Sequence, residues 1–249
     1  MDGRVAIVTG ASTGIGNASA LAFAKQGAHV VVADLDDERG ESVAEEAAAT
    51  GSESLFVHTD VTNPADVEAL VQRCVARFGR LDYAHNNAGI QTASSPTGDC
   101  SLDDWNRTLA VNLTGVFLCM RAEIPRLLEH DGGVIVNTSS AGGLKGFPGA
   151  SAYVSAKHGV IGLTKCAALE YATSGIRVNA VCPGVIDTEL TARFTQGDPQ
   201  LTAQLLDVEP VRRFGTPPEI ADAVLWLCSN QATFVTGHAL VIDGGQLAG

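Results

Sequence analysis

The sequence predicts a single-domain α/β fold, in which a doubly wound parallel sheet of about seven strands is flanked by helices. Short runs rich in β-branched residues alternate with longer helical patterns along the 249 residues, and several of these runs are apolar throughout. A strand without alternation is covered on both faces, as in a parallel sheet. The strand-like runs are Val5–Val8, Val30–Ala33, Leu55–Val57, Leu81–Ala84, Val134–Val136, Val178–Val181 and Leu240–Ile242.

Helix signals lie between these runs. Asn63 followed by Pro64 is typical of a helix start, because an Asn side chain caps free backbone N–H groups and Pro fits the first turn. We expect that helix to reach about Phe78. The Pro-Pro-Glu sequence at 217–219 opens another predicted helix, which continues to about Leu227.

The chain is expected to form one domain over residues 1–249. No linker rich in Ser, Gly or Pro divides it, and no internal repeat is visible. The β-α-β rhythm implies right-handed crossovers. The segment 185–215 interrupts this rhythm and is the least regular part of the chain. Long excursions of this kind often cover a ligand, so we predict a substrate-binding lid there.

Composition and charge exclude several classes of function. Hydrophobic residues make up 45% of the chain and charged residues 18%, which is typical of a folded globular protein. The net charge is −12 and no basic run is present, so we expect no nucleic-acid or membrane partner. The chain shows neither a signal-peptide pattern nor an apolar run of the ~18 residues that a membrane span needs, and we expect a cytoplasmic protein.

The cysteine pattern argues against a metal site. The six cysteines are scattered without CxxC spacing, and neither HExxH nor a calcium-loop pattern is present. A disulfide framework or a zinc site is therefore not expected, and free thiols in a reducing compartment are.

A glycine-rich turn follows the first strand. It reads TGASTGIG over Thr9–Gly16, and a helical pattern continues to about Gln26. Glycine permits positive φ and close approach of a ligand, and a helix N-terminus favours a pyrophosphate. Such a turn could be only a connection. A strand before it and a helix after it favour a dinucleotide-binding turn, although its TGxxxGxG spacing differs from G-x-G-x-x-G.

Asp34 ends the second strand-like run and favours NAD as the cofactor. A carboxylate at this position can accept both adenosine-ribose hydroxyls and would repel a 2′-phosphate. The alternative is that Asp34 caps the next helix, but Asp36 and Asp37 are better placed for capping. The turn contributes no Arg or Lys, and Leu35 follows the aspartate.

Tyr153 and Lys157 lie four residues apart in SAYVSAKHGV, so both project from one helical face. By spacing alone they could be unrelated neighbours. They could also be a proton donor and the cation that lowers its pKa from about 10. Unit charges ~4 Å apart at an effective dielectric of ~20 interact by about 4 kcal/mol, an upper bound near ~3 pKa units that desolvation opposes.

Together these residues give a chain that resembles the short-chain dehydrogenases/reductases over essentially its whole length. The motifs are the TGxxxGxG turn, Asp60-Val61 after the third strand, Asn86-Asn87-Ala88-Gly89 after the fourth, Asn112, Ser140 at 13 residues before Tyr153, Tyr153-x-x-x-Lys157, and Pro183-Gly184 with Thr188. The 13-residue spacing selects Ser140 over Ser139.

The resemblance implies a Rossmann-like sheet and hydride transfer between a nicotinamide cofactor and a carbinol carbon. It implies that Ser140 holds the substrate oxygen, Tyr153 is the general acid/base, Lys157 also binds the nicotinamide ribose, and Asn112 links Lys157 to solvent through water. The residues expected at the cofactor are Gly10, Ser12, Thr13, Gly14, Ile15, Gly16, Asp34, Leu35, Asp60, Val61, Asn87, Ala88, Gly89, Tyr153, Lys157, Pro183, Gly184, Ile186 and Thr188.

Three features stand apart from the family pattern or lack a role. His85 precedes the NNAG motif where the family usually has an aliphatic residue, and we expect it only to pack at the strand end. The polar segment 91–100 is expected to shape access of the substrate. His158 is expected to face another side of its helix from Lys157.

The helix that carries Tyr153 is expected to continue to about Thr173 and to be apolar on most sides. Such a helix is buried on most sides, either under its own chain or against a partner subunit. The family is commonly tetrameric, so we expect a homotetramer.

The predicted activity is NAD-dependent interconversion of a secondary alcohol and its ketone, with small, largely apolar and also cyclic compounds as substrates. Apolar residues of the lid and behind Ser140 suggest the pocket: Leu144, Phe147, Ile186, Leu190, Phe194, Leu201, Leu205, Leu206 and Phe214. One alternative is an NADPH-dependent 3-oxoacyl-carrier-protein reductase. Another is a non-enzymatic dinucleotide-binding scaffold, since a fold alone does not establish chemistry.

Overall fold

A computed structural model describes residues 1–130, 132–195 and 197–248, and its strands form one parallel sheet in the order β3-β2-β1-β4-β5-β6-β7. All seven predicted strands are confirmed, and they are β1 Val5–Thr9, β2 His29–Asp34, β3 Ser54–His58, β4 Tyr83–Asn86, β5 Gly133–Thr138, β6 Ile176–Pro183 and β7 Ala239–Ile242. The strand expected at 81–84 begins two residues later, because pairing with β1 starts at Tyr83. The order reverses between β1 and β4, which opens a crevice at their carboxyl ends.

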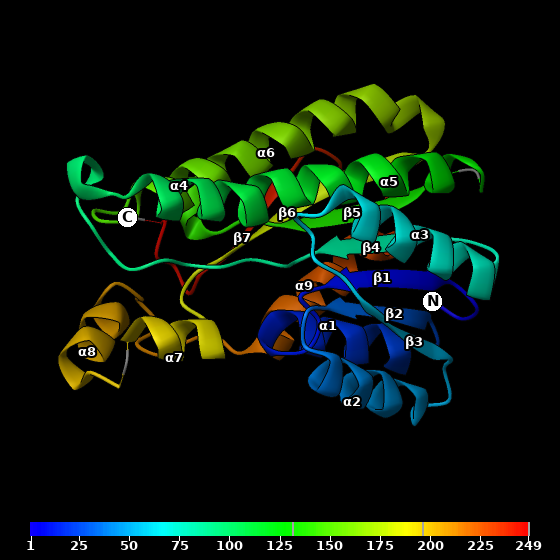
Figure 1. Cartoon of the computed structure of the whole chain (residues 1–249), viewed down its shortest axis with the longest axis horizontal. Helices are drawn as coiled ribbons and strands as arrows, with labels where there is room; N and C mark the ends of the chain where they lie inside the picture. Colours follow the sequence, from blue (N-terminus) through cyan, green and yellow to red (C-terminus); the bar gives the residue numbers. More distant parts are fainter. Residues whose placement is uncertain (131, 196, 249) are drawn as a thin grey trace.

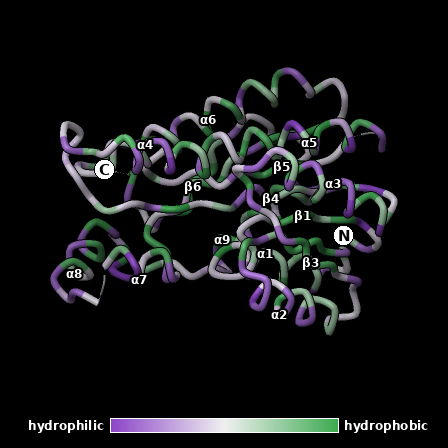
Figure 2. Tube along the Cα trace, viewed as in Figure 1, coloured by the Kyte–Doolittle hydropathy of each residue, from purple (hydrophilic) through white to green (hydrophobic). Residues whose placement is uncertain are grey.

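Helices cover both faces of the sheet (Figure 1). Their bounds are α1 Gly14–Lys25, α2 Asp37–Ala48, α3 Pro64–Phe78, α4 Leu102–Leu109, α5 Val116–Leu128, α6 Ser151–Tyr171, α7 Glu189–Thr195, α8 Pro199–Asp207 and α9 Pro217–Cys228. Helices α1, α2 and α9 pack on one face, and α3, α5 and α6 pack on the other. Side chains of β1 alternate between these two cores, and β1 is one of the hydrophobic stretches of the trace (Figure 2).

Helix caps follow the sequence signals. The Asn63 side chain accepts a hydrogen bond from the backbone N–H of Ala65 at 3.0 Å, and Pro64 occupies the first turn of α3. Asp36 caps α2 by accepting from the N–H of Arg39 at 3.0 Å. The carboxylate of Asp34 is therefore not used as a helix cap, as expected.

The segment 185–215 is more regular than the sequence suggested, because it contains α7 and α8. Asp198 caps α8, because its carboxylate accepts from the N–H of Gln200 at 2.8 Å. The ends of the segment are joined, since Gly215 donates to the carbonyl oxygen of Val185 at 2.9 Å. The segment is thus a closed excursion at the carboxyl edge of the sheet (Figure 1).

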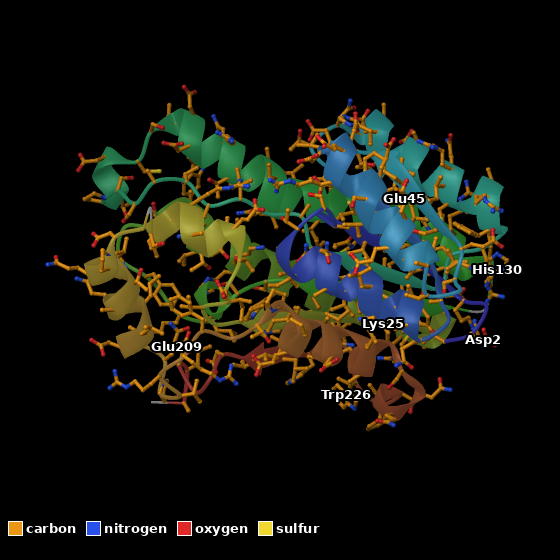
Figure 3. All side chains as sticks on the ribbon, turned by 90° about the horizontal axis from the view of Figure 1, so that it is seen from below. Asp2, Lys25, Glu45, His130, Glu209 and Trp226 are labelled. Carbon is orange, nitrogen blue, oxygen red and sulfur yellow. The ribbon has the colours of Figure 1, made fainter. Side chains whose placement is uncertain are left out.

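A buried carboxylate anchors the base of this excursion. Glu209 is 2% exposed and accepts a hydrogen bond from the N–H of Val185 at 2.8 Å. Its carboxylate lies close to the C-terminal segment, since a Cβ on Gly244 would be 3.2 Å from its Oε2, and Figure 3 labels its position. The glycine at 184 makes this approach possible, because a Cβ there would lie 2.8 Å from a carboxylate oxygen of Glu209.

Helix α6 is covered by its own chain on one face only. One face is buried and includes Ala156, Val160 and Ile161, but Leu169 is 85% exposed and Cys166 is exposed. His158 is also exposed, as predicted, and its Nδ1 lies 2.9 Å from the carbonyl oxygen of Val154. Within the described residues, no helix is both long and apolar enough to cross a bilayer.

Candidate active site

A cavity of about 1300 Å³ lies at the carboxyl ends of the central strands. The turn after β1, the end of β2 and the residues after β4 line one part, while α7, α8 and the segment after β5 line the rest. Most of the predicted site residues line this one cavity, but Gly16 and Asn112 do not. Gly16 shapes the turn, and Asn112 is fully buried.

Two glycines keep the turn after β1 tight. Gly10 has φ +63°, and a Cβ there would lie 2.8 Å from the Cα of Ala88. A Cβ on Gly16 would overlap the carbonyl oxygen of Gly10. The N-terminus of α1 is thereby open to a ligand, which is the arrangement that binds a pyrophosphate.

The second Asn of the NNAG motif holds this turn. The Asn87 side chain donates to the carbonyl oxygens of Thr9 at 3.1 Å and Gly10 at 3.2 Å. The backbone N–H groups of Asn87 and Ala88 donate in turn to the Thr9 hydroxyl, at 3.0 and 3.2 Å. The motif and the turn, almost 80 residues apart in sequence, therefore form one unit.

Asp34 lies beside this turn in the same cavity. Its carboxylate accepts from the N–H of Ser12 at 2.9 Å and from the N–H of Leu35 at 2.8 Å. Arg39, which the sequence reasoning missed, also lines this end. Its guanidinium is engaged by Glu189 of α7 at 2.7 Å. The sequence signal for Arg39 was an arginine in the first turn of α2, shortly after β2 ends at the crevice.

The remaining predicted cofactor residues complete this part of the wall. Asp60 accepts from the N–H and the hydroxyl of Thr62, both at 2.8 Å, which turns the chain after β3. Pro183, Gly184, Ile186 and Thr188 line the opposite side after β6. Thr191 donates its hydroxyl to the carbonyl oxygen of Ile186 at 2.6 Å, which fixes the start of α7.

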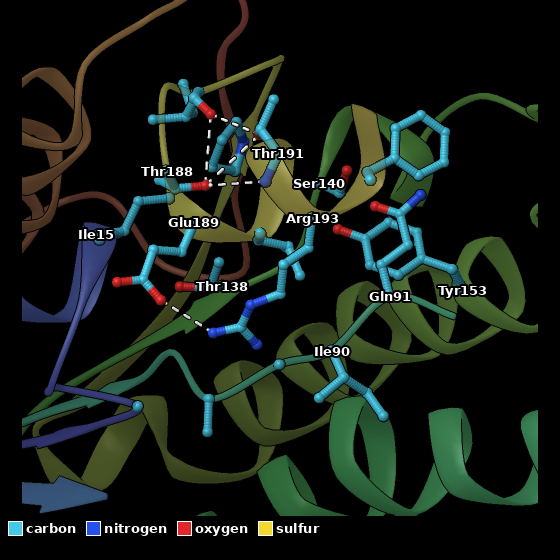
Figure 4. A pocket seen from close by; sticks show the side chains of 18 of the residues that line it. Ile15, Ile90, Gln91, Thr138, Ser140, Tyr153, Thr188, Glu189, Thr191 and Arg193 are labelled. Carbon is cyan, nitrogen blue, oxygen red and sulfur yellow. Dashed lines mark hydrogen bonds and ion pairs between the residues drawn. The ribbon is translucent and has the colours of Figure 1, made fainter. Parts of the chain in front are cut away.

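Tyr153 and Ser140 lie close together where the two parts of the cavity join (Figure 4), and Lys157 lines the cavity one helical turn along α6. The Lys157 Nζ lies 5.7 Å from the centroid of the Tyr153 ring and donates to the carbonyl oxygen of Thr138 at 2.7 Å. Ser139 donates its hydroxyl to the carbonyl oxygen of Lys157 at 2.9 Å, so that hydroxyl is occupied by α6. The geometry agrees with the choice of Ser140 over Ser139.

Burial dominates the protonation of this group. It raises the pKa of Tyr153, which a hydrogen bond with Ser140 lowers only in part, and it lowers the pKa of Lys157 to about 8. Without a bound cofactor, Lys157 therefore does not depress the pKa of Tyr153 as expected. Burial of the phenol dominates, and the Lys157 ammonium is directed to the carbonyl oxygen of Thr138.

Asn112 is fully buried in a π-helical segment, Ala110–Gly115. Its side-chain Oδ1 accepts from the N–H of Ile90 at 2.8 Å, and its Nδ2 donates to the carbonyl oxygen of Ile90 at 2.7 Å. This two-point contact ties the helix to the segment after the NNAG motif. A π-bulge of this kind often marks a functional position.

The first Asn of the NNAG motif faces the core instead. Asn86 donates to Glu123 Oε2 at 3.0 Å and to Asn137 Oδ1 at 3.1 Å. Asn137 donates in turn to the hydroxyl of Thr164 at 3.0 Å. Burial raises the pKa of Glu123 to about 7. Sequence reasoning missed this cluster, although a Glu inside an apolar helical run was its signal.

The substrate end of the cavity is mainly apolar, with polar groups at intervals. Its apolar walls include Phe147, Leu190, Phe194, Leu201 and Leu205, as expected. Three residues expected there do not line it: Leu144, Leu206 and Phe214. Gln91 and Ser94 of the polar segment 91–100 do line it, and Figure 4 draws Gln91 among the lining side chains. Polar lining residues that were not foreseen are Arg107, Gln204 and Gln246, and Arg193 of α7 lines the cavity too.

Comparison with known proteins decides the family. Residues 10–246 match the profile of a family described as enoyl-(acyl carrier protein) reductase. A cyclohexanol dehydrogenase of Acinetobacter sp. (strain SE19) is 44% identical over 241 residues, which are 97% of this chain and 94% of that protein. The chain belongs to the short-chain dehydrogenase/reductase family.

Other similar proteins agree with this assignment. A trans-4-hydroxycyclohexanecarboxylate dehydrogenase of Sinomonas cyclohexanicum is 42% identical, covering 99% of this chain and 93% of that one. The crystal structure of levodione reductase superposes with a TM-score of 0.96 at 37% identity, covering 100% and 99% of the two chains. A 3-ketoacyl-(acyl-carrier-protein) reductase from Brucella melitensis, complexed with NADH, gives a TM-score of 0.91 at 35% identity over 98% of both chains. This short-chain dehydrogenase/reductase is an oxidoreductase that interconverts alcohols and ketones, in a family that uses nicotinamide cofactors.

Proposed function

We propose that this protein interconverts a cyclic, largely apolar secondary alcohol and its ketone, with NAD as the hydride carrier and Tyr153 as the general acid/base. The observation that carries the proposal is the position of Tyr153 and Ser140 in the cavity. They lie where the part lined by the glycine turn and Asp34 meets the apolar part under α7 and α8. A carbinol carbon held there has a proton acceptor beside it and a place for a nicotinamide next to it.

Each side chain has a distinct chemical task. Ser140 holds the substrate oxygen, and Tyr153 removes its proton during oxidation or returns one during reduction. Lys157 stabilises the phenolate form of Tyr153, while Asn112 keeps its helical segment against Ile90. The nicotinamide, when bound, supplies or accepts the hydride, and its oxidised form adds a positive charge that favours phenolate.

The catalytic role has a direct test. Tyr153→Phe removes the acid/base and should lower kcat by ~10²–10⁴. Binding of NADH, followed by fluorescence, should fall far less than kcat, because Tyr153 is only one of many groups expected at the cofactor. Full activity of this variant would show that the assigned role is wrong.

The preference for NAD rests on Asp34. Its carboxylate is anchored on the N–H of Ser12 and faces the cavity, where it can accept ribose hydroxyls and would repel a 2′-phosphate. Arg39 lines this end of the cavity and would favour NADP, but it is engaged by Glu189. The ratio of kcat/KM for NAD⁺ over NADP⁺ measures the preference, and a ratio below one would contradict it.

The cyclic class of substrate rests on the apolar walls and on the relatives. Phe147, Phe194 and Leu205 give a broad apolar lining. Proteins at 44% and 42% identity are named as dehydrogenases of cyclohexanol and of a hydroxycyclohexanecarboxylate. A panel of cyclohexanol, methylcyclohexanols and linear secondary alcohols with NAD⁺ should favour the rings in kcat/KM. Faster turnover of the linear alcohols would contradict this part of the proposal.

A carrier-protein reductase is the second candidate, and the Brucella melitensis neighbour favours it. It predicts fast oxidation of NADPH with acetoacetyl-CoA, a small stand-in for the carrier-bound substrate. We expect this activity to be slow beside NADH-linked reduction of cyclohexanone. Tight NADH binding without turnover of any alcohol or ketone would instead support a non-enzymatic scaffold.

Assembly, lid and location are further parts of the proposal. Leu169 on α6 and Phe234 after α9 are almost wholly exposed, at 85% and 103%, and would be covered in a homotetramer. The segment 185–215 would act as the substrate-binding lid, and the protein would work in the cytoplasm. Light scattering at micromolar concentration tests the assembly, since a monomer would leave both side chains in water.

A further inference from the structure

His85 is the residue of β4 that departs from the family pattern, and it does more than pack. Its side chain is fully buried, one residue before the NNAG motif. The ring Nε2 lies 2.9 Å from the hydroxyl oxygen of Thr138, at the end of β5. Its Nδ1 is buried and, among the described residues, has no hydrogen-bond partner.

The hydrogen bonds around Thr138 determine which ring nitrogen carries the proton. Asn87 uses both amide hydrogens on the carbonyl oxygens of Thr9 and Gly10. Its Oδ1 is therefore an acceptor, and the Thr138 hydroxyl donates to it at 3.3 Å. A threonine has one hydroxyl proton, so Thr138 Oγ1 must accept from His85. His85 is thus the Nε2–H tautomer.

The buried Nδ1 supports the same assignment. In the other neutral tautomer it would be an orphaned N–H donor, and orphaned buried donors are the rarer defect. The charged imidazolium would have the same unpaired Nδ1–H and would also bury a charge. Burial lowers the pKa of His85 to about 3, so the ring is neutral at any working pH.

We propose that His85 is a positioning residue for the cofactor turn. Its Nε2–H directs the Thr138 hydroxyl toward Asn87, and Asn87 holds the turn at Thr9 and Gly10. The backbone carbonyl oxygen of Thr138 accepts a hydrogen bond from the Lys157 ammonium at 2.7 Å, so the same residue also positions the catalytic lysine. The inference rests on the proposed binding of a dinucleotide at this turn.

Substitutions at 85 that differ only in where they place a donor test this directly. A Gln amide nitrogen is as many bonds from Cβ as Nε2 of His, whereas an Asn amide matches Nδ1 and is too short. NADH affinity is measured by fluorescence titration. Loss of one net hydrogen bond corresponds to about a fivefold weaker affinity. We expect about this loss for His85→Leu and His85→Asn, and affinity within about twofold of the parent for His85→Gln.

The stability of a double variant separates positioning from packing. Thr138→Val should weaken NADH binding and lower the Tm, because it leaves the Nε2–H of His85 buried without an acceptor. Adding His85→Leu removes this unpaired N–H donor. The double variant His85→Leu/Thr138→Val should therefore melt above Thr138→Val while binding NADH no more tightly. A Thr138→Val protein that does not fold leaves the His85 series and the double variant as the test.

The outcomes are distinct from those of the proposed function. If the parent protein does not bind NADH or NADPH, the proposed function fails. If it binds and His85→Leu binds equally well, or His85→Gln and His85→Asn behave alike, the positioning role is overturned. Nitrogen-15 NMR of labelled histidine gives a readout that is independent of binding, with His85 assigned by its loss in the Leu variant. A neutral Nε2–H ring that does not titrate between pH 5 and 8 is expected, and an Nδ1–H or charged ring refutes the proposal.

Discussion

Glu123→Gln should stabilise this protein at neutral and alkaline pH. Glu123 is fully buried on α5, and its Oε2 accepts from the side-chain amide of Asn86 at 3.0 Å. Within the described part of the chain, Glu123 Oε1 and Asn86 Oδ1 are buried and have no partner. Two acceptors without a donor indicate a protonated carboxyl. The neighbouring Cys119 is buried too, with its pKa raised, and so adds no charge.

The magnitude follows from the pKa of Glu123, which burial raises from 4.5 to about 7. The folded state binds this proton more tightly than the unfolded chain does. The stabilisation is therefore fully present below the unfolded pKa and is lost as the pH rises through the folded value. Between pH 5 and pH 8 the loss is about 2–3 kcal/mol at ~1.36 kcal/mol per pKa unit. Gln provides the same donor and acceptor without a proton to lose.

Urea unfolding followed by circular dichroism at pH 5, 6, 7 and 8 checks this, at one protein concentration throughout because assembly also affects stability. The parent and Glu123→Gln should be similar at pH 5, and the variant should be more stable by about 2–3 kcal/mol at pH 8. Glu45→Gln on the exposed side of α2 is the matched control and should follow the parent. Parallel curves for the parent and Glu123→Gln would refute a protonated Glu123.

Three further substitutions test separate parts of the structure. Gly16→Ala should weaken NADH binding by at least ~10-fold in a fluorescence titration, because its Cβ would overlap the Gly10 carbonyl oxygen; unchanged affinity would contradict the tight turn. Lys157→Met should raise stability at pH 7 by about 2 kcal/mol while kcat falls by ~10² or more, because burial has lowered the lysine pKa to about 8; a lower Tm would contradict this. Asp82→Asn should cost about 2 kcal/mol at pH 7 in urea unfolding. Burial opposes ionisation of Asp82, but hydrogen bonds from Arg80 and other donors still lower its pKa, so this cost should shrink as the pH falls through the acid range; a cost independent of pH would contradict it.

The cofactor end of the site was largely predictable from the sequence. The TGxxxGxG turn, Asp34 and the NNAG motif each follow a strand-like run, and parallel strands bring their carboxyl ends to one edge. The predicted residues of these motifs therefore line one cavity, with Gly16 just behind it. Arg39 was missed because its position over the crevice depends on where α2 begins, and on Glu189 some 150 residues away.

The substrate end was less predictable. Leu205 lines the cavity but Leu206 does not, because α8 presents only part of its surface inward. Phe214 lies between α8 and α9 and does not reach the cavity either. The side of a short helix that faces a ligand depends on how its ends are anchored. Here the anchors are the pairing of Val185 with Gly215 and the buried Glu209, and neither is a local pattern.

The sequence by itself determined the seven strands, the cap at Asn63, the glycine turn and the spacing of Tyr153 and Lys157. These features depend on backbone preferences and side-chain periodicity within a few residues, so they can be read locally. Only the tertiary structure decided what His85 and Glu123 do. Strand pairing places Asn86 opposite Asn137 and brings Thr138 to His85, across more than 50 residues of chain. A buried polar group needs a hydrogen-bond partner close in space, and here the register of β4 against β5 provides that partner from a distant part of the sequence.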